Sequence, residues 1–225
     1  MDVIRLSADD HARVSTAIAA AEAKSDGEIV AIATDLSDSY HDVGLHWAVL
    51  ALFVSLGMFA AMPGWLEGAR DLISGWAGEP ALRDLLTLQL FVALLVFLLV
   101  LYACKWMPLR LALTPASTKL RRVRRRAIML FRTGAEKRTI GRTGILIYLS
   151  TAEHRAEIVA DEAITSVTDA DTWGEAMAAL LAEVKQGRPA DGIVAAIGLI
   201  GEVLAQHFPK TAGDSNEIPD KLIEL

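Results

Sequence analysis

Two long apolar stretches dominate the pattern of hydrophobic and polar positions along the chain. Residues 43–62 and 85–104 are runs of 20 residues that contain no Asp, Glu, Lys or Arg. A helix of about 20 residues is about 30 Å long, which matches the hydrocarbon core of a bilayer. A pair of buried core helices is the alternative, but such helices normally keep a polar face. The pattern therefore predicts a hairpin of two membrane-spanning helices.

The residues at the ends of these stretches support the same prediction. Pro63 and Gly64 end the first stretch, and Lys105 follows the second. Aromatic side chains that favour the membrane–water interface lie at or beyond the ends. They are Trp47, Trp65, Trp76, Tyr102 and Trp106.

The flanking segments alternate between the periodicities of helices and strands. Residues 8–24 predict an amphipathic helix that Ser7 caps. Residues 28–34 are a short apolar run typical of a buried strand, and residues 145–149 and 155–160 predict two further strands in antiparallel order. Three more helices are expected: one that begins near Pro115 and has basic residues on one face, one from Asp171 or Thr172 to Val184, and one over residues 190–208.

These elements predict an α/β domain that is interrupted by the hairpin, with helices covering a small sheet of three or four strands. The strand at 28–34 has no neighbour before the hairpin, so its expected partners are the strands that follow about 110 residues later. The last helix, over residues 190–208, is expected to be too short and too interrupted for a third span. The expected divisions are 1–42 and 108–210 for the two parts of the domain, 43–107 for the hairpin, and 211–225 for an irregular polar tail.

Charge is strongly segregated, although the formal net charge of the whole chain is only −6. Between Cys104 and Arg142 there are 12 basic residues and one acid, Glu136, whereas the segment between the two apolar stretches has only Arg70 and Arg83 as basic residues. Positive charge is enriched on the cytoplasmic side of membrane proteins. We therefore expect an inner-membrane protein with both termini in the cytoplasm.

The basic segment 105–126 is expected to contact anionic lipid headgroups, because it follows directly after a membrane span. Nucleic acid is the alternative partner, but the segment has no zinc-finger spacing and no RNA-binding aromatic signature. The sequence thus favours a lipid partner and no nucleic acid.

No catalytic constellation is apparent in the sequence. There is no Gly-rich phosphate loop and no paired-histidine metal motif, and the five histidines are scattered. The single cysteine, Cys104, lies at the end of an apolar stretch, where a buried thiol is expected. We therefore expect no catalytic and no cofactor-binding residues.

Several ordered segments carry a resemblance to a known family. They read SDGEIVAIATDLSDSY, TGILIYLSTAEHRAEIVADEAI, GRPADGIVAAIGLIGEVLAQHFP and NEIPD. Together they resemble the TPM domain family, named for a thylakoid lumen protein, a photosystem II repair protein and an acetylcholine-receptor modulator. This chain is most similar to bacterial members with two membrane spans inside the domain. The resemblance implies an α/β/α sandwich, and in some members acid phosphatase activity or calcium binding by acidic loops.

The resemblance makes acidic residues near the strand and helix ends candidate ligands for Ca²⁺ or Mg²⁺, which prefer oxygen ligands. The main candidates are Asp35, Asp38, Asp161 and Asp171, with Asp42, Glu162 and Asp169 beside them. They form a site only if the ends of these elements converge. Helix caps, turns and surface charge explain each of them separately.

Two functions are compatible with these observations. The first is a membrane-tethered interaction or assembly module that docks an unknown membrane protein and has no catalysis of its own. The alternative is a membrane-bound phosphatase that depends on a divalent metal. A channel or transporter is disfavoured, because the two apolar stretches contain no charged residue.

Overall fold

The computed structural model describes residues 6–74, 81–134, 143–169, 171–212 and 218–225. The chain divides into two compact units. The first unit combines Met1–Ser39 with Ala116–Leu225, and the second is Tyr40–Pro115. A domain built from both ends of the chain therefore has the second unit inserted between its two parts.

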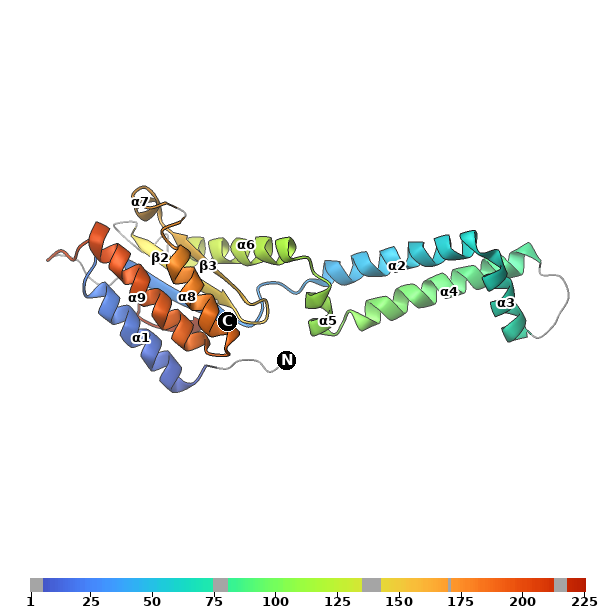
Figure 1. The fold of residues 1–225 in the computed structure, drawn as a ribbon, viewed down its shortest axis with the longest axis horizontal. Helices are drawn as coiled ribbons and strands as arrows, with labels where there is room; N and C mark the ends of the chain where they lie inside the picture. Colours follow the sequence, from blue (N-terminus) through green and yellow to red (C-terminus); the bar gives the residue numbers. More distant parts are fainter. Residues whose placement is uncertain (1–5, 75–80, 135–142, 170, 213–217) are drawn as a thin grey trace. The chain divides into compact units, whose positions relative to one another are not determined.

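A four-stranded mixed sheet lies at the centre of the first unit (Figure 1). Its strands are β1 (Glu28–Thr34), β2 (Gly144–Ser150), β3 (Arg155–Ala160) and β4 (Leu222–Glu224), in the order β3-β2-β1-β4. Strand β1 runs parallel to both β2 and β4, and β3 is antiparallel to β2. The predicted α/β class is confirmed, and β1 pairs with β2 but not with β3.

One face of the sheet carries the larger hydrophobic core. Alternate residues of β1 and β2, among them Ile29, Ala31 and Ile147, point to this face, as the period of a strand requires. Helices α1 (Ala8–Glu22), α8 (Gly174–Lys185) and α9 (Pro189–His207) cover it (Figure 1). The expected N-cap of α1 is present, because Ser7 and Asp10 form a reciprocal capping box.

The opposite face is partly covered by α6 (Ala116–Gly134), the predicted basic helix. Its buried residues Val123, Ala127 and Phe131 pack against Leu146 and Tyr148 of β2. The sheet is thus enclosed by helices on both sides, which is the layer arrangement of an α/β/α sandwich.

The second unit contains the predicted hairpin. Helices α2 (His41–Ala61) and α4 (Leu82–Ala103) pack against each other, with α3 (Pro63–Ser74) after α2 and α5 (Met107–Ala112) after α4. Small residues let the two helices approach closely. A Cβ atom added to Gly44 would lie 2.9 Å from Cβ of Cys104, so only glycine fits at this position.

An arginine completes the carboxyl end of α4. The Arg110 side chain is buried and its Nε donates to the carbonyl oxygen of Cys104 over 2.7 Å. A cation at this end complements the helix dipole and satisfies a carbonyl that has no partner within the helix. Its Nη1 also lies 3.2 Å from Nδ1 of His41, at the start of α2. Arg110 therefore joins the two ends of the hairpin.

Parts of the described chain differ from the sequence-based expectations. The tail is not wholly irregular, because Leu222–Glu224 forms β4 at the edge of the sheet. Helix α8 begins at Gly174, with Trp173 at its N-cap, and neither Asp171 nor Thr172 caps it. Finally, α3 and α5 are additional helices within segments that had no predicted helix. Trp76 and Arg142 lie outside the described residues.

Candidate functional site

A polar cluster lies where β1 and β2 end, at the edge of the sheet where ligands bind in open α/β folds. The buried carboxylate of Glu153 accepts hydrogen bonds from the amide of Ser37, over 3.0 Å, and from the hydroxyl of Ser150. The hydroxyl of Tyr148 donates to Oγ of Ser37 over 2.9 Å, and burial raises the pKa of this tyrosine. These groups pair with one another, and they hold the loop after β1 against the end of β2.

Two of the predicted metal ligands belong to this same edge. Asp35 follows β1, and its carbonyl oxygen accepts the amide of Ala152. Asp38 lies three residues further along, and its Oδ2 is 3.0 Å from Nη1 of Arg122 on α6. The carboxylate of Asp38 therefore forms an ion pair that joins the loop after β1 to α6.

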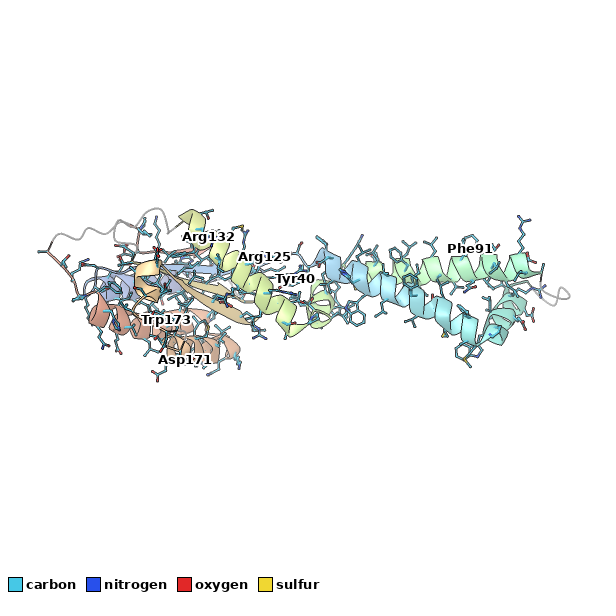
Figure 2. The ribbon with its side chains drawn as sticks, turned by 90° about the horizontal axis from the view of Figure 1, so that it is seen from above. Tyr40, Phe91, Arg125, Arg132, Asp171 and Trp173 are labelled. Atoms are coloured by element: carbon cyan, nitrogen blue, oxygen red, sulfur yellow. The ribbon has the colours of Figure 1, made fainter. Side chains whose placement is uncertain are left out.

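The other two predicted ligands lie elsewhere. Asp161 follows β3, which is antiparallel to β2, and its amide donates to the carbonyl of Gly144 at the start of β2. It is thus at the opposite end of the strands from Asp35, and its Oδ1 accepts the amide of Glu162 as the N-cap of α7 (Glu162–Thr165). Asp171 lies in the turn before α8 (Figure 2).

The turn before α8 is organised by Asp169 and not by Asp171. Oδ1 of Asp169 accepts the amides of Asp171 and Thr172 and the hydroxyl of Thr172. The hydrogen bonds from Thr172 lower the pKa of Asp169. Within the described part of the chain, no group of three or more His, Cys, Asp or Glu side chains is arranged to hold a metal ion.

A second acidic group, which the sequence analysis did not single out, is buried where α1 meets the sheet. Glu22 is only 6% exposed, and its Oε1 accepts the amide of Ile29 over 2.7 Å. Its Oε2 is buried and accepts no hydrogen bond in the described structure. Burial, with smaller contributions from the carboxylates of Glu28 and Asp220, raises the pKa of Glu22 to about 8. Glu22 is therefore protonated at neutral pH.

The sequence gives no clear signal for this group. Glu22 occupies the last turn of an amphipathic helix, where an acidic residue normally faces solvent. In the folded domain its carboxylate interacts with the Ile29 amide of β1 and with Asp220 in the segment before β4.

Helix α6 presents a basic face away from the sheet. It contains seven basic residues and no acid. Arg121, Arg125 and Arg132 are exposed and lie opposite the buried stripe by helical spacing. Figure 2 shows Arg125 and Arg132 on this helix. Burial raises the pKa of Glu157 on β3, and the positive charge of Arg124 partly opposes this rise.

The hairpin helices expose an extensive apolar surface. In the most apolar 18-residue windows of α2 and α4, only 22% and 6% of the residues are buried. The exposed side chains on α4 include Phe91, labelled in Figure 2. The set comprises Leu45, Trp47, Val49, Leu50, Phe53, Val54 and Met58 on α2, and Leu82, Leu86, Leu90, Phe91, Leu94, Leu95, Leu98, Leu99 and Tyr102 on α4.

Three described helices are long and apolar enough to cross a membrane: α2, α4 and α9. The sequence analysis expected the last helix to be too short and too interrupted for a span, but α9 is long and apolar enough for one. Half of its most apolar window is buried, however, and residues such as Ile193, Ile197 and Leu204 belong to the core of the first unit. These three helices fit a membrane protein.

Comparison with known proteins shows a likeness in fold. No family model and no curated protein matches the chain. A solved structure that is similar is the NMR structure of the BA42 protein from the psychrophilic bacterium Bizionia argentinensis. The two are 18% identical, the match covers 98% of this chain and 95% of that one, and the TM-score is 0.56. At this level of identity the likeness concerns the fold alone.

Proposed function

We propose that this chain is an integral membrane protein whose α2–α4 hairpin crosses the bilayer twice. The observation that carries this proposal is the exposed apolar surface of the two helices. A soluble protein rarely exposes a continuous apolar surface of this kind, whereas lipid tails solvate it without cost. Helix α9 is assigned to the domain and not to the membrane, because its apolar face packs against α1, α8 and the sheet.

We further propose that both termini lie in the cytoplasm of a bacterial cell, with the protein in the inner membrane. The support is the excess of basic residues after α4. A reporter that works only outside the cytoplasm should be active when it is inserted between residues 75 and 80. A reporter that works only inside the cytoplasm should be active when it is fused after Leu225. The reverse pattern would overturn the orientation.

The domain itself is proposed to be a tethered interaction module that resembles the TPM family and has no catalysis of its own. The enclosed α/β/α layers are compatible with that family. The polar groups at the carboxyl edge of β1 and β2 bond to one another and to Arg122, which is the arrangement of a structural clamp. Affinity capture from gently solubilised membranes should recover a reproducible membrane-protein partner, with an unrelated tagged hairpin as the control. Repeated recovery of this chain alone would contradict the module.

The outward arginines of α6 are proposed to bind anionic lipid headgroups. Each basic residue near an anionic surface contributes about 1 kcal/mol, and salt screens the attraction. In nanodiscs that contain anionic lipid, the α6 amides should exchange hydrogen more slowly than in purely zwitterionic nanodiscs. High salt should abolish the difference.

A triple variant tests which residues are responsible. Replacing Arg121, Arg125 and Arg132 by glutamine should remove the effect of anionic lipid, whereas the control Lys185→Gln on α8 should keep it. Equal exchange in both lipids for the unmodified chain would refute the proposed contact.

A further inference from the structure

A cavity of about 390 Å³ lies beside α6 on the second face of the sheet. Its walls come from β1, β2, α6 and the segment that leads into β4. They include Val30 and Ile32 from β1, Leu130 and Phe131 from α6, and Ile218 and Ile223 near the end of the chain. All of these residues belong to the first unit. The volume lies within the usual range of small-molecule sites, about 300–1,000 Å³.

The cavity exists because α6 covers only part of this face. Helix α6 packs against β2 and β3, whereas β4 is a short edge strand. Ile223 of β4 points to the same face as its neighbour Ile32, because the two are paired in register, and it remains 40% exposed. Apolar side chains at this edge thus line an open space instead of contacting another element of the described structure.

The charge around the cavity selects the class of ligand. Among its described lining residues, Lys221 is the one with a charge, and no acid is present. The residues of α6 that line the cavity, Leu130, Phe131 and Gly134, carry no charge. An apolar cavity with a cation at its rim suits an anionic amphiphile, since the chain displaces water from apolar walls and the head pairs with the lysine.

We propose that this cavity binds the acyl chain of a long-chain fatty acid, whose carboxylate pairs with Lys221. The proposal rests on the membrane association proposed above, because a chain held in a bilayer meets fatty acids at a high local concentration. Replacing Ile223 by a bulkier residue should therefore fill the cavity. Replacing Lys221 by a neutral residue should remove the partner of the carboxylate.

Photo-crosslinking with a diazirine-labelled palmitic acid in nanodiscs tests both proposals separately. After irradiation of the full chain, labelled peptides are mapped by mass spectrometry. Labels in α2 and α4 report the membrane hairpin, and labels in residues 128–134 and 218–225 report the cavity. We expect both groups, with the second group competed away by unlabelled palmitate.

Variants identify the cavity as the source of the second group. Ile223→Trp should reduce its labelling at least about tenfold by filling the cavity. Lys221→Gln should reduce it about fivefold through the loss of a partly exposed ion pair. Leu225→Trp, which adds the same side chain outside the lining, and Lys185→Gln should leave it unchanged. Circular dichroism of each variant confirms that it folds.

Each outcome has one meaning. Labelling of the hairpin alone would overturn the fatty-acid site and leave the membrane hairpin intact. Labelling of the cavity alone would overturn the hairpin, and labelling of neither would overturn both. Equal labelling of Ile223→Trp and the unmodified chain, with both folded, would also overturn the site.

Discussion

Replacing Glu22 by glutamine should remove a large part of the pH dependence of the domain's stability near neutral pH. The carboxyl group is buried, its Oε1 accepts the amide of Ile29, and the charged groups that act on it are the acids Glu28 and Asp220. Glutamine keeps the shape and the acceptor for Ile29 but does not titrate. The substitution therefore isolates the proton.

The sign follows from the two protonation states. The pKa of Glu22 rises from 4.5 to about 8 on folding, so in this interval the folded domain holds a proton that the unfolded chain has released. The contribution of Glu22 to stability is then fully present below about pH 4.5 and falls as the pH rises toward 8. Each pH unit within the interval costs about 1.4 kcal/mol, so the loss between about pH 6 and about pH 8 is about 2 kcal/mol. More than about one pH unit above the pKa of 8, the contribution of Glu22 becomes constant.

Hydrogen exchange of the Ile29 amide in the full chain, held in detergent micelles, provides the assay. The unmodified chain and Glu22→Gln are compared at the same pH, so that the intrinsic exchange rate cancels. The ratio of the Ile29 protection factor in Glu22→Gln to that in the unmodified chain should rise roughly thirtyfold between about pH 6 and about pH 8. Parallel profiles of the two proteins over this range would refute a protonated Glu22 in the folded domain.

Three further predictions concern other contacts. Gly44→Leu should destabilise the hairpin by about 1–3 kcal/mol in thermal unfolding, because its Cβ would overlap Cys104, whereas Gly57→Leu, which meets no atom within 4 Å, should not. A double-mutant cycle of Asp38→Asn and Arg122→Gln should give a coupling energy of at most about 1 kcal/mol in urea unfolding, since the pair is partly exposed, and a larger value would contradict this assignment. Asp161 lies about 20 Å from Asp35 along the strands, so the two acids should not belong to one Ca²⁺ site. If Asp35→Asn abolishes Ca²⁺ binding measured by calorimetry, Asp161→Asn should leave that binding unchanged. A loss with both variants would show that the two acids share a site.

The features that the sequence predicts are those that depend on local pattern alone. The two apolar helices follow from the absence of charge over the width of a bilayer, and β1 and β2 follow from short runs of β-branched residues. The basic face of α6 is equally local, because its stripe of Val123, Ala127 and Phe131 has helical spacing. Each of these segments carries enough residues for the pattern to be recognised.

The features that the sequence misses depend on partners distant in the chain. Strand β4 has only three residues, and only the unpaired edge of β1 makes them a strand. Whether acidic residues converge depends on strand direction, which separates Asp161 from Asp35 because β3 runs back along β2. The surroundings of Glu22 include Asp220 in the segment before β4, almost 200 residues further along. Periodicity contains no information about such contacts.

The inserted hairpin also has a simple relation to the topology of the sheet. Parallel neighbours such as β1 and β2 need a crossover connection, which is usually a helix packed on the sheet. Here α6 is that helix, since it lies between the two strands in sequence and covers one face. The residues from Tyr40 to Pro115 therefore lengthen a crossover that α6 already provides.

Replacing Tyr40–Pro115 by a short linker should accordingly yield a folded, water-soluble domain. Asp38 and Arg122 are joined by an ion pair, and Arg122 lies six residues, or about 9 Å of helix, after Ala116. A linker of about eight Gly and Ser residues has a mean span of about 15 Å, which bridges Ser39 and Ala116. The β1–β2 amide signals in an NMR spectrum measure the outcome, and the same deletion with Tyr148→Ala provides a destabilised control. An unfolded product would mean that the hairpin contributes to the folding of the sheet and is more than an extension of its crossover.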